Sequence, residues 1–208
     1  MDIQFHGANC ITLATKHARV TIDDNIVDLG GKAVSKAGDI ALFTGAHGDP
    51  AAAPKIVIDQ PGEYEVSGVS IYGIPARAHM DEPNQRSATV FKLVVDDVRI
   101  LVVGHIYPEF SDTQLEAIGM VDVMIVPVGG NGYTLDSVGA LKLVKKIEPK
   151  LVIPTHFEDA ALEFPVPQHP LEEAVKTFGL ESKEIGNKLK LKHGELEDTM
   201  QIAILERV

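Results

Sequence analysis

The sequence predicts an α/β domain in which β-sheets are covered by helices. Residues 1–103 consist of short β-branched and aromatic segments separated by Gly, Pro, Asp and Asn, which is typical of strands joined by tight turns. After residue 104, apolar strands alternate with segments of helical periodicity, which is typical of helices packed on a sheet. A chain of 208 residues, 45% of them hydrophobic, can bury one large core. We therefore expect a single domain over residues 1–208.

The first half is predicted to contain strands and turns. The expected strands cover residues 3–5, 10–13, 20–22, 41–44, 56–58, 64–66, 69–73, 89–95 and 99–103. Asp96 and Asp97 join the last two of these strands. Two residues of this type between strands predict a hairpin.

The second half is predicted to alternate strands and helices. Strands are expected at residues 123–126, 151–154 and 201–205, and helices at residues 113–118, 137–147 and 171–178. Asp112 is the expected N-cap of the first helix, and either Thr134 or Asp136 is that of the second. The apolar residues that repeat with helical spacing in the second helix are Val138, Leu141, Val144 and Ile147.

Composition limits the partners that we expect. The net charge is −11, from 19 basic and 30 acidic residues. Nucleic-acid binding usually requires a basic face, so we do not expect this protein to bind nucleic acid. The sequence begins without the basic and apolar segments of a signal peptide and has no apolar run that could cross a bilayer, so we expect a cytoplasmic protein without membrane contact. The lone Cys10 lies in an apolar strand and is expected to be an inert thiol rather than a nucleophile. The composition is compatible with a small-molecule substrate.

Five candidate site residues follow predicted strands, where strand ends form the rim of a pocket. They are His47, Asp49, His79, His105 and His156. Imidazole and carboxylate groups suit a cation such as zinc. The alternative is that these are ordinary loop residues, because eight histidines must lie somewhere in the chain.

Several segments resemble the metallo-β-lactamase superfamily, and in particular its small bacterial hydrolases related to ascorbate-6-phosphate lactonase. Thr44-Gly45-Ala46-His47-Gly48-Asp49-Pro50 is similar to the family's Thr-His-x-His-x-Asp-His. The segment ending at His79, the strand before His105, Val126-Pro127-Val128-Gly129-Gly130 and Ile153-Pro154-Thr155-His156 are similar to further family segments. The resemblance implies an αβ/βα four-layer sandwich of two mixed sheets flanked by helices.

The departures from the family motif change the metal site that the resemblance implies. Gly45 and Pro50 stand at two ligand positions and offer no side-chain ligand. His105 stands where the family has an aspartate that bridges two metals, and a neutral imidazole gives one lone pair to one metal. We therefore expect one divalent ion, zinc or alternatively manganese, at Asp49, His105 and His156. His47 and His79 occupy further ligand positions but are too few to hold a second ion.

The resemblance then implies a metal-dependent hydrolase acting on a small anionic ester, lactone or phosphoester through a metal-activated water. Asp49 is expected to orient or deprotonate that water, and His47 or His79 to protonate the leaving group. The alternative is a scaffold or binding protein that keeps the fold without metal. Residues 129–132, rich in glycine, favour either an anion subsite before the helix or simply a strand-to-helix turn.

Overall fold

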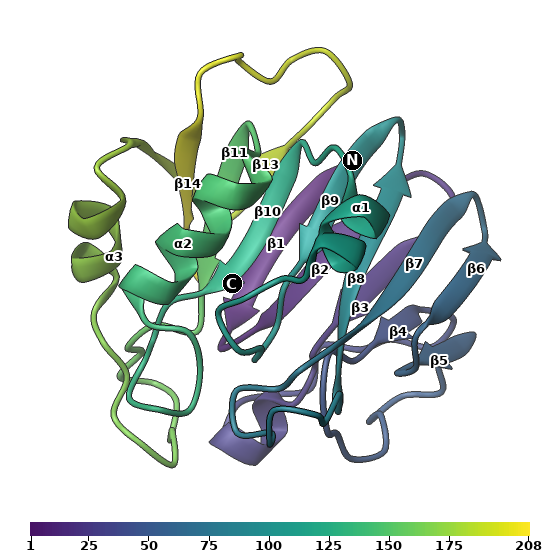
Figure 1. Ribbon diagram of the computed structural model, residues 1–208. Coiled ribbons are helices and arrows are strands. Elements are labelled where there is room, and N and C mark those ends of the chain that lie inside the picture. The colour runs from purple at the N-terminus through teal and green to yellow at the C-terminus, as the bar shows by residue number, and fades with distance from the viewer.

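The computed structural model describes residues 1–208 and contains two mixed β-sheets (Figure 1). The six-stranded sheet consists of β1 (Asp2–Gly7), β2 (Cys10–Ala14), β3 (Arg19–Ile22), β4 (Ile40–Leu42), β5 (Ile56–Ile58) and β13 (Leu189–Lys190). Its strand order is β13-β1-β2-β3-β4-β5. β1, β2 and β3 are antiparallel, whereas β3, β4 and β5 are parallel.

The eight-stranded sheet has the order β12-β14-β11-β10-β9-β8-β7-β6. Its strands are β6 (Gly62–Val66), β7 (Val69–Ala76), β8 (Ala88–Val95), β9 (Val98–Val102), β10 (Val123–Pro127), β11 (Leu151–Thr155), β12 (Glu181–Gly186) and β14 (Gln201–Leu205). β9, β10 and β11 are parallel, and β7 runs in their direction because two antiparallel pairings separate it from β9. The carboxyl ends of these four strands therefore share one edge of the sheet.

Three helices cover the outer face of the eight-stranded sheet. They are α1 (Asp112–Ile118), α2 (Ser137–Ile147) and α3 (Leu171–Phe178), and the six-stranded sheet lies behind the larger one in this view (Figure 1). A single 3-10 turn, η1 (Ile26–Leu29), follows β3. The predicted arrangement of two mixed sheets flanked by helices is confirmed.

The core has two layers. One lies between the sheets and contains Ile3, Leu13, Phe91 and Ile125 among its buried side chains. The other lies between the eight-stranded sheet and the helices and is formed by the alternate residues of the same strands. Adjacent residues of β10 and β11 therefore enter opposite layers, which explains why both strands are buried along their whole length.

Most predicted elements lie within a few residues of their expected bounds, and α2, α3, β5 and β14 match them. The Asp96-Asp97 hairpin is also present, with positive φ angles of 49° and 62°. β12 and β13 were not expected, because β12 is a polar edge strand and β13 has only two residues. No helix is long and apolar enough to cross a membrane.

Two details of the helices differ from expectation. Ser111, not Asp112, is the N-cap of α1, because its hydroxyl accepts from the Gln114 amide while the Gln114 side chain accepts from the Ser111 amide. Asp136 caps α2. Val138 is 66% exposed, so its expected place in the buried face is wrong. The buried face passes instead through Ala140, Leu143 and Val144.

Candidate active site

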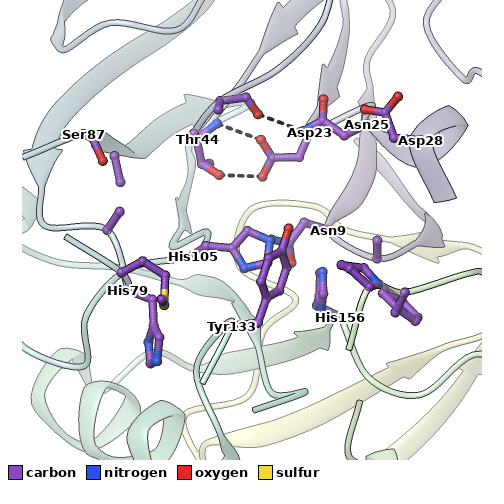
Figure 2. Close-up of a pocket in the computed structure, with 18 of the residues that line it drawn as sticks. Asn9, Asp23, Asn25, Asp28, Thr44, His79, Ser87, His105, Tyr133 and His156 are labelled. Atoms are coloured by element: carbon purple, nitrogen blue, oxygen red, sulfur yellow. Dashed lines mark hydrogen bonds between the residues drawn. The ribbon is translucent and has the colours of Figure 1, made fainter. Parts of the chain in front are cut away.

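A cavity of about 410 Å³ lies where strand ends of the two sheets meet. Asp23 and Thr44 reach it from the loops after β3 and β4 of the smaller sheet. His79, His105 and His156 reach it from the loops after β7, β9 and β11 of the larger sheet. The shared edge explains how residues far apart in sequence come together here (Figure 2).

His105 and His156 are neighbours in this cavity. Their ring centroids are 4.5 Å apart and their planes are nearly perpendicular, at 86°. The Tyr133 ring packs against both, at 5.2 Å from His105 and 5.9 Å from His156 (Figure 2). Phe164 lies 5.0 Å from His156 and also lines the cavity. The two imidazoles are therefore held on a partly aromatic wall.

Gln168 fixes the orientation and tautomer of His156, and sequence reasoning missed it. The Gln168 amide nitrogen donates to the Val166 carbonyl at 2.8 Å, so its oxygen is the atom that faces His156. His156 Nδ1 lies 3.0 Å from that oxygen and must donate to it. This leaves the lone pair of the imidazole on Nε2. A second residue that fixes the tautomer in this way is typical of histidines that bind metals.

Burial keeps both histidines neutral. Loss of hydration, together with the smaller effects of the neighbouring His156 and His79, lowers the pKa of His105 to about 3. Burial likewise lowers the pKa of His156 to about 4, against the opposing effect of the hydrogen bond to Gln168. Neutral imidazoles are the form that can bind a cation.

Asp23 is a second residue that sequence reasoning missed. Its carboxylate accepts hydrogen bonds from the Thr44 amide and the Thr44 hydroxyl, each at 2.7 Å (Figure 2). Burial raises the pKa of Asp23 to about 6, although both bonds from Thr44 favour the ionised form. The signal in the sequence was weak, because Asp23 follows a short strand in a run of polar residues and belongs to no motif that we considered.

Gly104 allows Thr44 to pack against the backbone just before His105. Its φ is +67°, and a Cβ atom at this position would lie 2.3 Å from the Thr44 hydroxyl oxygen. The contact connects the loop after β4 with the loop that carries His105. Glycine before His105 is therefore required both by the backbone conformation and by this close approach.

His47 and Asp49 do not join the other candidates, although convergence of all five was expected. The His47 ring stacks on Phe43 with centroids 3.8 Å apart, and its nitrogens face the Gly48 carbonyl and the Asp59 carboxylate. Asp49 is exposed, and neither residue lines the cavity. Gly45 and Pro50 stand where the family motif has two further histidines, so this loop brings no histidine side chain into the cavity.

The remaining donors do not form a complete metal site in their present positions. Nδ1 of His79 and Nδ1 of His105 are both buried without a hydrogen-bond partner, which is costly unless a ligand completes them. No group of three or more His, Cys, Asp or Glu side chains is placed so that it could hold a metal ion. His105 and His156 lie together, whereas the His79 ring points away from them (Figure 2), so a single ion held by all three would require the His79 ring to turn. The donor set lacks any bridging carboxylate for a second ion.

The glycine-rich segment 129–132 forms a tight turn beside the cavity. A Cβ atom on Gly129 would lie 2.0 Å from the His156 carbonyl oxygen, so this segment must pass closely along the end of β11. The Asp136 carboxylate already accepts the Gly139 amide at the start of α2, at 2.6 Å. The turn interpretation is therefore favoured over an anion subsite, because a carboxylate at this position repels a second anion.

The two sheets, their helices and the histidines at strand ends define a protein of the metallo-β-lactamase fold. The chain belongs to the β-lactamase superfamily domain family, whose model matches residues 2–156. A UPF0173 metal-dependent hydrolase from Pyrococcus horikoshii is 33% identical over 101 residues, which are 46% of this chain and 44% of that protein. A UPF0173 metal-dependent hydrolase from Carboxydothermus hydrogenoformans is 45% identical over 49 residues, 23% of this chain and 21% of that protein. The chain thus matches less than half the length of these curated relatives.

Solved structures share the fold along most of the chain. A Thermotoga maritima protein described as a candidate zinc-dependent hydrolase of the metallo-β-lactamase superfamily has a TM-score of 0.77 and 23% identity, covering 99% of this chain and 100% of its own. Igni18, a metallo hydrolase from Ignicoccus hospitalis, has a TM-score of 0.61 and 16% identity, covering 86% of this chain and 90% of its own. These similarities establish the fold.

Proposed function

We propose that this protein is a hydrolase that binds one divalent metal ion and acts on a small uncharged ester or lactone. The single observation that carries the proposal is the pair of buried, unpartnered Nδ1 atoms of His79 and His105 beside the neutral His156. The metal-dependent hydrolases among the relatives support the same class of activity.

The proposed ligands are His79, His105 and His156, so His79 replaces the Asp49 expected from the sequence. Zinc suits an all-imidazole set, and manganese, which prefers oxygen ligands, is the alternative to be tested. When bound, the ion supplies positive charge that polarises a carbonyl oxygen and acidifies water. Gln168 holds the His156 ring with Nε2 free, while Tyr133 packs against both histidines and Phe164 packs against His156.

An uncharged substrate is proposed in place of the anionic one that was expected from the sequence. Asp23, Asp28 and Asp81 are among the residues that line the cavity, and no Lys or Arg is among them. Carboxylates repel an anionic substrate, and the buried Asp23 does so most strongly because little solvent screens it. Apolar lining residues such as Leu29 and Met80 favour a substrate with an aliphatic portion.

Calorimetric titration of metal-stripped protein with zinc tests the metal site, and hydrolysis of p-nitrophenyl acetate tests the activity. We expect one ion per chain and a zinc-dependent rise in hydrolysis that His156→Ala abolishes. His17→Ala is the matched control, because His17 is exposed and remote from the lining residues. Hydrolysis that persists in excess chelator, or that survives His156→Ala, would contradict the proposal. The same experiments with manganese separate the two metals.

A second candidate function is a binding protein that works without metal. It is favoured by the absence of any three metal-binding side chains in a suitable arrangement. Protein that takes up neither zinc nor manganese, and that hydrolyses nothing with either ion, would support this candidate instead. The cavity would then bind its ligand through hydrogen bonds and apolar contacts.

A further inference from the structure

The turn between β1 and β2 places Asn9 at the wall of the cavity. This turn is fixed to the end of β11 by two hydrogen bonds. The His156 amide donates to the Ala8 carbonyl at 2.8 Å, and the Thr155 hydroxyl donates to Asn9 Oδ1 at 2.9 Å. Asn9 is therefore attached to the two residues that end β11, one of which is His156.

The amide nitrogen of Asn9 has no partner. Asn9 is only 6% exposed, and its Nδ2 atom is buried without a hydrogen bond. Because Oδ1 is occupied by Thr155, the free group is the NH₂ donor. A buried donor left without an acceptor costs about 1–3 kcal/mol, so an acceptor from outside the chain is expected.

The cavity determines what kind of acceptor fits. Asn9 lines the same cavity as His105 and His156 and lies beside them in Figure 2. The lining carboxylates Asp28 and Asp81 disfavour a ligand with a full negative charge. A neutral carbonyl oxygen accepts a hydrogen bond without carrying such a charge.

We propose that Nδ2 of Asn9 donates a hydrogen bond to the carbonyl oxygen of an uncharged substrate in this cavity. The inference rests on the proposed function for the substrate class, but it concerns ligand binding and does not require a metal. Asn9 is then a substrate-binding residue that selects a neutral carbonyl group. An amide donor fixed before the ligand arrives loses little entropy on binding, which is the advantage of this arrangement.

Nuclear magnetic resonance of the metal-free, ¹⁵N-labelled chain tests the inference, with γ-butyrolactone as the uncharged probe. The side-chain amide signals of Asn9 are assigned as the pair that disappears in Asn9→Asp. We expect these signals to move downfield and to saturate as lactone is added. The ring-opened γ-hydroxybutyrate, which has a carboxylate, should bind at least about tenfold more weakly.

Two variants and one control test whether the Nδ2 donor of Asn9, rather than a change of charge, accounts for lactone binding. Asn9→Asp keeps the acceptor for Thr155 but removes the donor, and Asn9→Leu removes it without adding charge. Both should weaken lactone binding about tenfold, as measured from the chemical-shift changes of the Ala78 and Ala88 backbone amides during the titration. Asn25→Asp is the matched control, because the Asn25 amide also lines the cavity but already donates to the Ala46 carbonyl. It should change the affinity by less than about twofold.

The outcomes that overturn the inference differ from those that overturn the proposed function. An Asn9 amide signal that does not move at any lactone concentration overturns it, and this is also the result expected if a fixed water satisfies Nδ2. Weakened binding in Asn9→Asp but not in Asn9→Leu also overturns it, because charge would then be the cause. A saturable Asn9 shift in protein that hydrolyses no ester supports the inference while removing the proposed activity. Zinc affinity should be the same in wild type and Asn9→Leu.

Discussion

The carboxylate of Asp23 holds Thr44 by two hydrogen bonds of 2.7 Å, one from the backbone amide and one from the hydroxyl. Asp23 follows β3 and Thr44 follows β4, so the contact fixes two neighbouring loops of the six-stranded sheet relative to each other. Thr44 in turn packs against Gly104, which precedes His105. A buried carboxylate outside the candidate ligand set thereby positions one of the candidate ligands.

Asp23→Asn should change how stability depends on pH. Burial raises the pKa of Asp23 from 3.8 to about 6, so between these values the folded chain keeps a proton that the unfolded chain has released. The stability that protonated Asp23 contributes is therefore complete below pH 3.8 and is lost as the pH rises through about 6. Relative to Asp23→Asn, wild type should lose about 3 kcal/mol of unfolding free energy over this window. Urea unfolding at several pH values measures this, and a constant difference would contradict the assignment.

Gly104→Ala should damage both the fold and the position of His105. The new Cβ atom would meet the Thr44 hydroxyl oxygen at 2.3 Å, and a φ of +67° is unfavourable for alanine. We expect a loss of about 2–4 kcal/mol in unfolding free energy. Gly194→Ala is the control, because its φ of +82° carries similar backbone strain while its Cβ would meet nothing within 4 Å. Equal losses in the two variants would show that the contact with Thr44 is unimportant.

The buried histidines should make the metal-free protein sensitive to acid. The folded pKa values of His105 and His156 are lowered to about 3 and about 4, below the ordinary value of 6.5. The unfolded chain therefore takes up protons first, and the stability present above pH 6.5 is lost as the pH falls towards these values. This effect opposes that of Asp23 in the same pH range.

His105→Gln should separate the two effects. The variant removes one titrating group from the folded cavity and should lessen the loss of stability on acidification, as measured by urea unfolding from pH 7 down to about pH 4. His17→Gln is the control, because His17 is exposed. An unchanged acid dependence in His105→Gln would mean that another group, such as the half-buried His6, controls it.

The sequence predicted most strands and helices because local patterns determine them. Hydrophobic alternation, the Asp96-Asp97 turn and the glycine after α3 are all visible without tertiary information. Val138 was misplaced because helical spacing gives a periodicity but leaves the exact face to packing. β13 could not be predicted, because two residues become a strand only through their pairing with β1.

Three of the five candidate site residues line the cavity, as the sequence predicted, and two do not. His79, His105 and His156 were found because they follow strands whose carboxyl ends share an edge. His47 follows a strand as well, but its ring turns onto Phe43, and no sequence pattern indicates that rotation. Asn9 was missed because it contacts Thr155, 146 positions away, and Gln168 was missed because it lies in a loop and belongs to no motif that we considered.

Replacement of Asp122 should destabilise the fold without affecting the cavity. Its carboxylate accepts hydrogen bonds from the Arg99 backbone amide, Nε and a terminal guanidinium nitrogen, at 2.9, 2.8 and 2.7 Å. These contacts join β9 to the start of β10, at the edge of the sheet opposite the cavity. Asp122→Asn should lower the unfolding free energy at neutral pH by about 2 kcal/mol, because a charge-assisted bidentate pair is lost in a largely buried place.

The Arg99 hydrogen bonds lower the pKa of Asp122 below 3.8, so its contribution should be present above that pH and should disappear as the pH falls below it. The difference between wild type and Asp122→Asn should accordingly shrink in strong acid. Lys183→Ala is the control, because the pair of Lys183 with Glu197 is exposed and should contribute little to stability. Zinc affinity should be equal in wild type and Asp122→Asn. A fall in zinc affinity would show that this edge of the sheet is coupled to the site, against the view that the pair only joins the two strands.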